Sequence, residues 1–149
     1  MEILDFKMAH DENVYPPSED SYLLVKAINS NNSRKALEIG IGSGVISLHL
    51  AKEIDSVFGC DINPYSLFLS RQNALANSIN NIYLFSSNIF SSIKAGTLFD
   101  LIVFNPPYLP VDSSPRKLID LSYHGGIDGG DHIRTFLKSL GLFLSFNGI

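Results

Sequence analysis

The stretch from Asp100 to Tyr108 constrains the fold of this chain more than any other part of it. Leu101 to Phe104 form a short apolar run with β-branched residues, which is typical of a strand buried on both faces of a parallel sheet. Asn105-Pro106-Pro107-Tyr108 follows this run directly. Because open α/β sheets bind ligands at the carboxyl ends of their strands, the pattern predicts a carboxamide at a ligand-binding edge.

The residue types in this motif indicate a particular chemistry. Pro106 and Pro107 lack an N–H and have a fixed φ, so the turn is stiff and its carbonyls are free to accept hydrogen bonds from a ligand. Asn105 Oδ1 and the Pro106 carbonyl together suit the two hydrogens of a planar NH2 group, with Tyr108 stacked on its face. The four residues are therefore the candidate catalytic group, and they favour methyl transfer to an amide or exocyclic amino nitrogen.

Apolar strand-like runs alternate with helix-like segments along the rest of the chain. Strands are expected at 36–39, 57–61, 82–85 and 100–104, and helices at 18–28, 45–52, 63–77 and 133–140, with a long loop over 105–130. Ser18 and Asn63 are the expected N-caps, and Pro64 stands at a first helical position. This alternation predicts a Rossmann-like α/β fold with a mostly parallel, doubly wound sheet.

The end of the chain predicts an incomplete sheet. Phe146 to Ile149 reads as a turn that leads into a fifth strand. We expect one domain over 1–149 that lacks its last strands, with the Leu101 to Phe104 strand near an open edge.

A glycine-rich segment, Glu38-Ile39-Gly40-Ile41-Gly42-Ser43-Gly44, follows the first expected strand and opens a helix. It fails the dinucleotide fingerprint G-x-G-x-x-G/A, because its third position is Val45 or Ser47, depending on the register. Asp61 closes the second strand, where an acid grips a ribose diol. The plainer interpretation is a glycine turn and an Asp that caps the next helix. Three motifs at three strand ends favour the nucleotide-type site.

Composition excludes several other classes. A net charge of −4 over 149 residues argues against strong binding of a phosphate backbone. A single cysteine, Cys60, excludes an internal disulfide and a cysteine-based zinc site. The first residues carry neither a basic region nor a long apolar stretch, and no segment reaches membrane-spanning length, so we expect a cytoplasmic protein.

The remaining reactive side chains favour ordinary roles. Cys60 is expected to be a buried core thiol without a partner base. His124 and His132 flank a Gly-Gly loop, but their spacing matches no common zinc motif, so no metal site is expected. Arg116 and Lys117 lie in the long loop and are expected to face water.

Taken together, these motifs resemble those of class I S-adenosylmethionine-dependent methyltransferases, and more narrowly the HemK-type protein-glutamine methyltransferases. Tyr15-Pro16-Pro17-Ser18-Glu19-Asp20-Ser21 is similar to the Tyr-x-Pro-x-Glu-Asp-Thr/Ser segment of the small archaeal and eukaryotic branch. Gly125-Gly126-Ile127-Asp128-Gly129 is similar to the Gly-Gly-x-x-Gly loop of the family. The resemblance covers about residues 13 to 149.

The resemblance implies a set of cofactor contacts. They are Ser21, Glu38, Gly40, Gly42, Gly44, Asp61, Ile62, Asn88, Ile89 and Asn105. Asn88 stands where the family usually carries an Asp that contacts the adenine amino group. It keeps an acceptor oxygen but loses the charge, so we expect adenine recognition to survive in a weaker form.

The resemblance also implies a substrate and a partner. The leading hypothesis is methylation of the glutamine in the Gly-Gly-Gln motif of a peptide-chain release factor. The alternative is a nucleic-acid amino methyltransferase, which usually carries a basic surface or a target-recognition domain. A third hypothesis is that the chain is a non-catalytic binding module. By resemblance, a small zinc-binding activator subunit forms a heterodimer with the enzyme, and the apolar strand 82–85, which has no charged neighbours, is a candidate contact.

Overall fold

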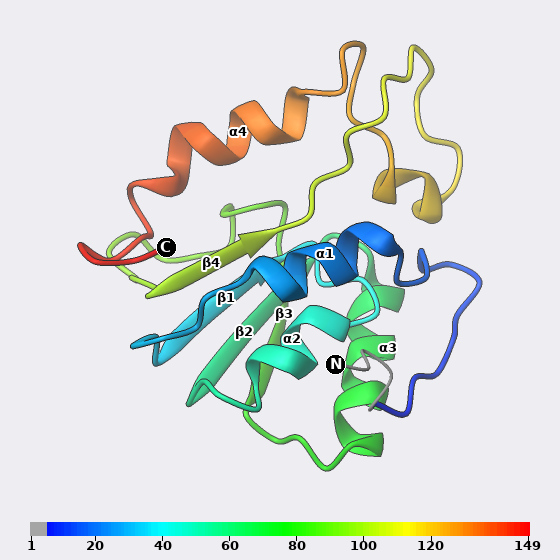
Figure 1. The fold of residues 1–149 in the computed structure, drawn as a ribbon. Helices are drawn as coiled ribbons and strands as arrows, with labels where there is room; N and C mark the ends of the chain where they lie inside the picture. Colours follow the sequence, from blue (N-terminus) through cyan, green and yellow to red (C-terminus); the bar gives the residue numbers. More distant parts are fainter. Residues whose placement is uncertain (1–5) are drawn as a thin grey trace.

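Four parallel strands form one sheet in the order β3-β2-β1-β4 (Figure 1). They are β1 (Lys35–Ile39), β2 (Ser56–Asp61), β3 (Ile82–Ser86) and β4 (Leu101–Phe104). This computed structural model describes residues 6–149. All four expected strands are confirmed, and so is the parallel α/β class.

Residues 6–149 contain five helical segments, one before the first strand and the others between or after the strands. They are α1 (Glu19–Ala27), α2 (Val45–Leu50), α3 (Pro64–Ala76), the 3-10 helix η1 (Leu118–Ser122) and α4 (Asp131–Leu140). The Asn63 cap is confirmed, because its side chain accepts a hydrogen bond from the Tyr65 amide at 3.0 Å. Ser18 precedes α1 as expected but makes no capping hydrogen bond with its side chain. The short helix η1 was not expected. None of the helices in residues 6–149 is long and apolar enough to cross a membrane.

Successive residues of each strand point to opposite faces of the sheet, and both faces are covered. Ala36, Val57, Leu101 and Val103 pack with α2 residues and with apolar residues of α1. Leu37, Cys60 and Ile102 pack on the other face, which is covered by residues 89–99 and by Phe136 and Leu140 of α4. Figure 1 shows α4 set apart from α1, α2 and α3 across β4. Burial on both faces explains why the strands read as continuous apolar runs.

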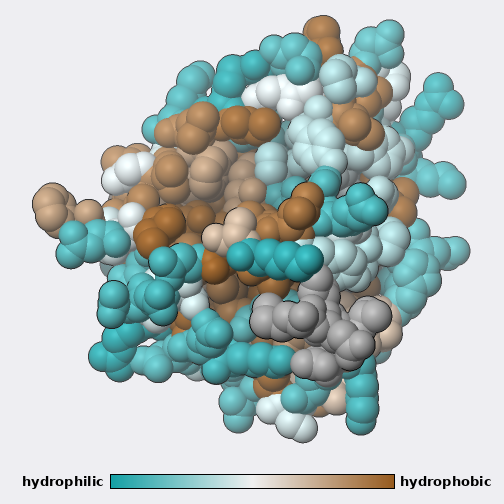
Figure 2. Space-filling model, viewed as in Figure 1, coloured by the Kyte–Doolittle hydropathy of each residue, from teal (hydrophilic) through white to brown (hydrophobic). Residues whose placement is uncertain are grey.

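The outer edge of β4 is partly paired by the residues that follow α4. Phe99 forms a parallel bridge with Leu144, and Ile149 exchanges two 2.9 Å hydrogen bonds with the Asp100 carbonyl and the Ile102 amide. An apolar groove of about 450 Å³ lies along this edge between α1 and α4. Figure 2 shows the exposed hydrophobic surface there. The sequence placed the strand over 100–104 near an open edge, and β4 is the outer strand of the sheet.

The order of the strands sets the position of the site. Ile39, the last residue of β1, pairs with Cys60 of β2 on one side and with Phe104 of β4 on the other. The residues that follow each strand, beginning with Gly40 and Asn105, are thus brought together at one edge with Asp61, the last residue of β2. Three motifs that are far apart in the sequence become neighbours.

Candidate functional site

A cleft of about 610 Å³ opens at the carboxyl ends of β1, β2 and β4. This volume falls within the range of about 300–1,000 Å³ that is typical of small-molecule sites. The predicted residues that line it are Ser21, Glu38, Gly40, Gly42, Asp61, Ile62, Asn88, Ile89, Asn105, Pro106, Pro107 and Tyr108. The structure therefore brings together all but one of the predicted catalytic and cofactor-binding residues.

The glycine loop adopts a backbone that few other residues tolerate. Gly40 and Gly42 have φ values of +70° and +53° and expose their backbone to the cleft. The Gly40 amide donates to the Cys60 carbonyl at 2.8 Å, which fixes where the loop begins. Gly44 is the exception among the predicted cofactor residues, because it does not line the cleft. A Cβ on Gly44 would lie 3.1 Å from Ser70 of α3, so this glycine permits close packing of the loop on that helix.

Asp61 joins the loop to the second strand. Its Oδ1 accepts a hydrogen bond from the Asn63 amide at 2.9 Å, and its Oδ2 accepts one from the Gly42 amide at 3.0 Å. Burial raises the pKa of this carboxyl, and these hydrogen bonds oppose the rise. Asp61 is therefore a preorganised acceptor at the cleft. It does not cap α3, because Asn63 does so.

Glu38 lies deeper and is only 2% exposed. Its Oε2 accepts hydrogen bonds from the Ser47 amide, at 2.8 Å, and from the Ser47 hydroxyl. Burial dominates over these bonds and raises the pKa of Glu38 to about 8. The carboxyl is therefore largely protonated at neutral pH in the ligand-free protein.

The raised pKa of Glu38 predicts a pH dependence of stability. Between its ordinary value of 4.5 and about 8, the folded state holds a proton that the unfolded state has released. Stability should therefore fall as pH rises through this window, by up to about 1.4 kcal/mol per pH unit. Glu38→Gln carries no such proton and should show a flatter profile in urea unfolding. Identical slopes for the two proteins would contradict the assignment.

The Asn105-Pro106-Pro107-Tyr108 turn continues from β4 along the cleft. Neither the Asn105 side chain nor the Pro106 carbonyl has a hydrogen-bond partner among residues 6–149, so both are available to a ligand. The Tyr108 hydroxyl donates to Asp20 Oδ2 of α1, and this contact raises the pKa of Tyr108. The rim segment 15–21 is thereby tied to the turn over 105–108, and Tyr15 lines the cleft beside it.

The Gly-Gly loop holds the same turn from its other side. Leu109 donates to the Tyr123 carbonyl at 3.0 Å and accepts from the Gly125 amide at 2.9 Å. Gly129 has a φ of +78°, and a Cβ there would lie 2.3 Å from the Tyr108 carbonyl oxygen. The loop over 123–129 therefore works as a close-fitting support for Tyr108.

A substitution in this loop tests the support. Gly129→Ala combines the positive φ with a clash against Tyr108, so it should displace the turn and lower activity at least about 10-fold. Gly96→Ala is a matched control, since Gly96 has a φ of +84° but open space around it. Both variants should lose roughly 1–2 kcal/mol of unfolding free energy, by the cost of a positive φ. Equal activities of the two variants would show that the contact with Tyr108 does not matter.

Residues 87–89 form a tight turn at the cleft wall. Ile89 has a φ of +51°, uncommon for a non-glycine residue, and Ser87 Oγ donates to the Ile89 carbonyl at 2.9 Å. Asn88 is exposed at the cleft, and its backbone is bonded to Ser91: its amide donates to Ser91 Oγ at 3.2 Å and its carbonyl accepts from the Ser91 amide at 3.0 Å. Its side chain has no hydrogen-bond partner among residues 6–149. Ile62, which is 50% exposed, adds an apolar surface. A polar amide and an apolar side chain together suit a flat heterocyclic ring.

Of the other reactive residues that the sequence drew attention to, His132 alone lines the cleft. Cys60 is fully buried, and burial raises the pKa of its thiol to about 12, which confirms a core role. His132 lines the cleft, whereas His124 does not. The part of the chain that the structure describes holds no group of three or more possible metal ligands. Arg116 and Lys117 are exposed and do not line the cleft.

Sequence reasoning missed part of the wall. The missed residues are Leu121, Ser122 and Tyr123, in and just after η1. They come from the long loop that the sequence left without structure. The Tyr123 hydroxyl donates to Asp120 at 2.6 Å, a local contact that no periodic pattern signals.

The cleft lies at the carboxyl ends of a Rossmann-like sheet, and the fold is that of the class I methyltransferases. A solved 16S rRNA methyltransferase of T. thermophilus, in complex with AdoMet and guanosine, shares the fold. Its TM-score is 0.68 at 21% identity, over 89% of this chain and 33% of that chain.

Sequence comparison gives the family. Residues 9–118 match the methyltransferase small domain, and the chain belongs to this family. It is 36% identical to a Methanocaldococcus jannaschii protein named as a protein N5-glutamine methyltransferase, over 100% of this chain and 76% of that protein. It is 37% identical to the release factor glutamine methyltransferase of Fusobacterium nucleatum, over 73% of this chain and 32% of that protein. These relatives confirm the resemblance to HemK-type enzymes.

Proposed function

We propose that the protein transfers a methyl group from S-adenosylmethionine to the side-chain amide of glutamine, in the Gly-Gly-Gln motif of a peptide-chain release factor. The observation that carries this proposal is the pair of unpartnered acceptors, Asn105 Oδ1 and the Pro106 carbonyl, beside the glycine loop. Two adjacent acceptors match the two hydrogens of a primary amide. The names of the M. jannaschii and F. nucleatum relatives support the choice of glutamine.

The cleft fits the cofactor in its donors and acceptors. Asp61 is the acceptor for a ribose diol, with a carboxylate already oriented by the Gly42 and Asn63 amides. Asn88 and Ile62 suit the adenine ring, and the bare backbone of Gly40 and Gly42 allows close approach of the rest of the ligand. When bound, S-adenosylmethionine supplies an electrophilic methyl group on a sulfonium.

The residues of the turn act by orientation. An amide nitrogen is a poor nucleophile because its lone pair is delocalised into the carbonyl. Asn105 and the Pro106 carbonyl accept both N–H bonds and so aim the lone pair across the cleft, which contributes as much as about 7–11 kcal/mol. The nitrogen would form its bond to the methyl carbon as the bond between that carbon and the sulfonium breaks, which would leave S-adenosylhomocysteine. The methylated nitrogen would then lose one proton to solvent. No general base is needed before attack, because the methylated nitrogen becomes strongly acidic. His132 lines the cleft, but this step does not require it.

The second candidate function is methylation of a nucleic-acid amino group. The fold neighbour from T. thermophilus is named as a 16S rRNA methyltransferase. The two acceptors of the Asn-Pro-Pro-Tyr turn suit the NH2 group of a nucleic-acid base as well as that of an amide. Charge favours the protein substrate. Of the residues described, those that line the cleft include Glu19, Asp20 and Asp61 but no Lys or Arg. A phosphate backbone at this rim would meet carboxylates without compensating cations.

A side-by-side methyl-transfer assay tests the choice. A release factor and a mixture of DNA and RNA would be offered to the purified protein with labelled S-adenosylmethionine. We expect label in the release factor, at the glutamine of the Gly-Gly-Gln motif by mass spectrometry. A release factor with that glutamine changed to alanine is the control. Label in nucleic acid alone would establish the second candidate.

Loss of the strand-end acid should weaken cofactor binding far more than folding. Asp61→Ala removes charge-assisted hydrogen bonds to the ribose, which should cost roughly 1.5–3 kcal/mol of binding free energy. Calorimetric titration of wild type and variant measures this difference. An unchanged affinity would refute the ribose assignment, and no binding by the wild type would favour the non-catalytic module.

Loss of the Asn105 carboxamide should lower turnover while cofactor binding stays nearly unchanged. Asn105→Ala should lower turnover at least about 100-fold, because the acceptor nitrogen is no longer oriented. Cofactor affinity should change little, since the interaction is needed mainly in the transition state. A variant with near wild-type turnover on a release factor would rule out the amide clamp.

The proposed activator subunit has a candidate contact surface. β3 is an edge strand, and Tyr83 on it is 50% exposed. Two apolar side chains of the adjacent helix α3, Phe68 and Leu75, are 60% and 67% exposed. They stand seven residues apart and so share one face of the helix. Exposed apolar edges and faces are usually covered, which supports a partner here.

Co-expression tests this surface. We expect the chain alone to be poorly soluble or weakly active, and co-expression with the zinc-binding activator to rescue it. Phe68→Lys should abolish rescue, because it places a charge in the contact. Leu23→Lys is the matched control, since Leu23 is 64% exposed on α1. A stable and fully active monomer in size-exclusion chromatography would exclude the activator.

A further inference from the structure

A row of polar residues runs along the packed side of α3, beside the buried Leu69 and Ala74. Positions 63, 66, 70, 73 and 77 recur at spacings of three and four, so they share one face of the helix. The residues at these positions are Asn63, Ser66, Ser70, Asn73 and Asn77, of which the first four are 3% exposed or less. Buried polar groups are costly unless they are hydrogen-bonded, so this face must have specific partners.

Some of these partners belong to the glycine loop. Ser70 Oγ donates to the Gly42 carbonyl at 2.8 Å, and Asn73 Nδ2 donates to the Ser43 carbonyl at 2.9 Å. Both carbonyls belong to the loop that lines the cleft. The loop is therefore held from behind by α3, on the side away from the ligand.

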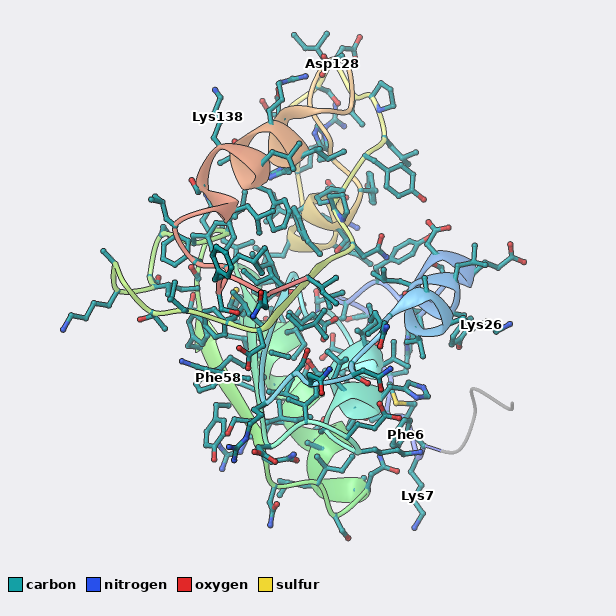
Figure 3. All side chains as sticks on the ribbon, turned by 60° about the vertical axis from the view of Figure 1, so that its left-hand side comes forward. Phe6, Lys7, Lys26, Phe58, Asp128 and Lys138 are labelled. Atoms are coloured by element: carbon teal, nitrogen blue, oxygen red, sulfur yellow. The ribbon has the colours of Figure 1, made fainter. Side chains whose placement is uncertain are left out.

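The others belong to residues 6–14, which we call the N-terminal strap. Asn77 accepts from the Lys7 amide at 2.8 Å and donates to the Lys7 carbonyl at 2.9 Å. The Ala9 amide donates to Asn73 Oδ1 at 2.7 Å. Figure 3 shows Phe6 and Lys7 beside α2 and α3, at the opposite end of the molecule from Asp128. The strap continues directly into the cleft rim at Tyr15.

Asn73 holds a special place in this arrangement. Among residues 6–149 it is the one α3 side chain that bonds to both the strap and the loop. Its orientation is determined by its partners, because the Ala9 amide needs an acceptor and the Ser43 carbonyl needs a donor. The carboxamide is rigid and 0% exposed, so neither end can turn to water if its partner leaves.

We propose that Asn73 is a positioning residue that couples the seating of the N-terminal strap to the cofactor affinity of the glycine loop. This inference rests on the proposed use of the loop as a cofactor site. When the strap leaves, Asn73 Oδ1 loses the Ala9 amide as its donor, and the side chain is free to reorient and release the Ser43 carbonyl. By linkage the effect is reciprocal, so a bound cofactor also holds the strap in place.

A double-mutant cycle in the full chain tests the coupling. Ala9→Pro removes the backbone N–H that donates to Asn73 Oδ1 and keeps the Asn73 side chain. Asn73→Leu introduces a side chain of similar size that can bond neither to the Ala9 amide nor to the Ser43 carbonyl. S-adenosylhomocysteine is the probe, and its affinity is measured by calorimetry. Each single variant should weaken binding by about 5- to 150-fold, the usual range for coupled sites. The double variant should bind no more weakly than Asn73→Leu alone.

Two further readouts separate positioning from general destabilisation. His10→Pro is the matched control, because the backbone amide of His10 has no hydrogen-bond partner among the described residues. This variant should bind S-adenosylhomocysteine as tightly as wild type. At saturating cofactor, the turnover of Ala9→Pro should equal that of wild type, with only the KM for the cofactor raised.

The possible outcomes are distinct. If Ala9→Pro binds like wild type, or if the effects of the two substitutions add, the coupling is wrong while the proposed function stands. If the wild type binds no S-adenosylhomocysteine, the proposed function fails and the coupling fails with it. If Asn73→Leu does not fold, the comparison of Ala9→Pro with His10→Pro decides, because both keep the Asn73 side chain.

Discussion

The central position of β1 between β2 and β4 is the constraint on which the rest of the structure depends. All three strands run parallel, so their carboxyl ends meet at one edge and their following residues converge. The glycine loop after β1 touches Asp61 through the Gly42 amide, and it lies beside the Asn105 turn. The topology of the sheet thereby places the proposed cofactor loop and the proposed acceptor turn side by side.

The supports of this edge are hydrogen bonds and close contacts more than apolar packing. The glycine loop is backed by the polar face of α3, and the Asn105 turn by the loop over 123–129. Tyr108 and Asp20 connect the turn to α1. Apolar burial holds the sheet beneath, on both of its faces.

Much of the fold was predictable because its signals are local. The apolar runs of four or five residues marked all four strands, and Asn63 before Pro64 marked the start of α3. The roles of the α3 polar face and of η1 were not predictable, because they depend on partners far away in the sequence. Asn73 meets Ala9 and Ser43, which are 64 and 30 residues distant. The sequence assigned Gly44 to the cofactor because it stands in the glycine motif. Its close approach to Ser70 of α3 depends on tertiary packing, which the motif does not reveal.

The central claim is that Asn105 Oδ1 and the Pro106 carbonyl hold a primary amide at the cofactor cleft. A crystal structure with S-adenosylhomocysteine and a peptide that contains Gly-Gly-Gln tests it most directly. We expect the glutamine nitrogen to lie within about 3 Å of both acceptors, at ordinary hydrogen-bond distance. A glutamine side chain bound elsewhere, with Asn105 bonded instead to the protein, would contradict the claim.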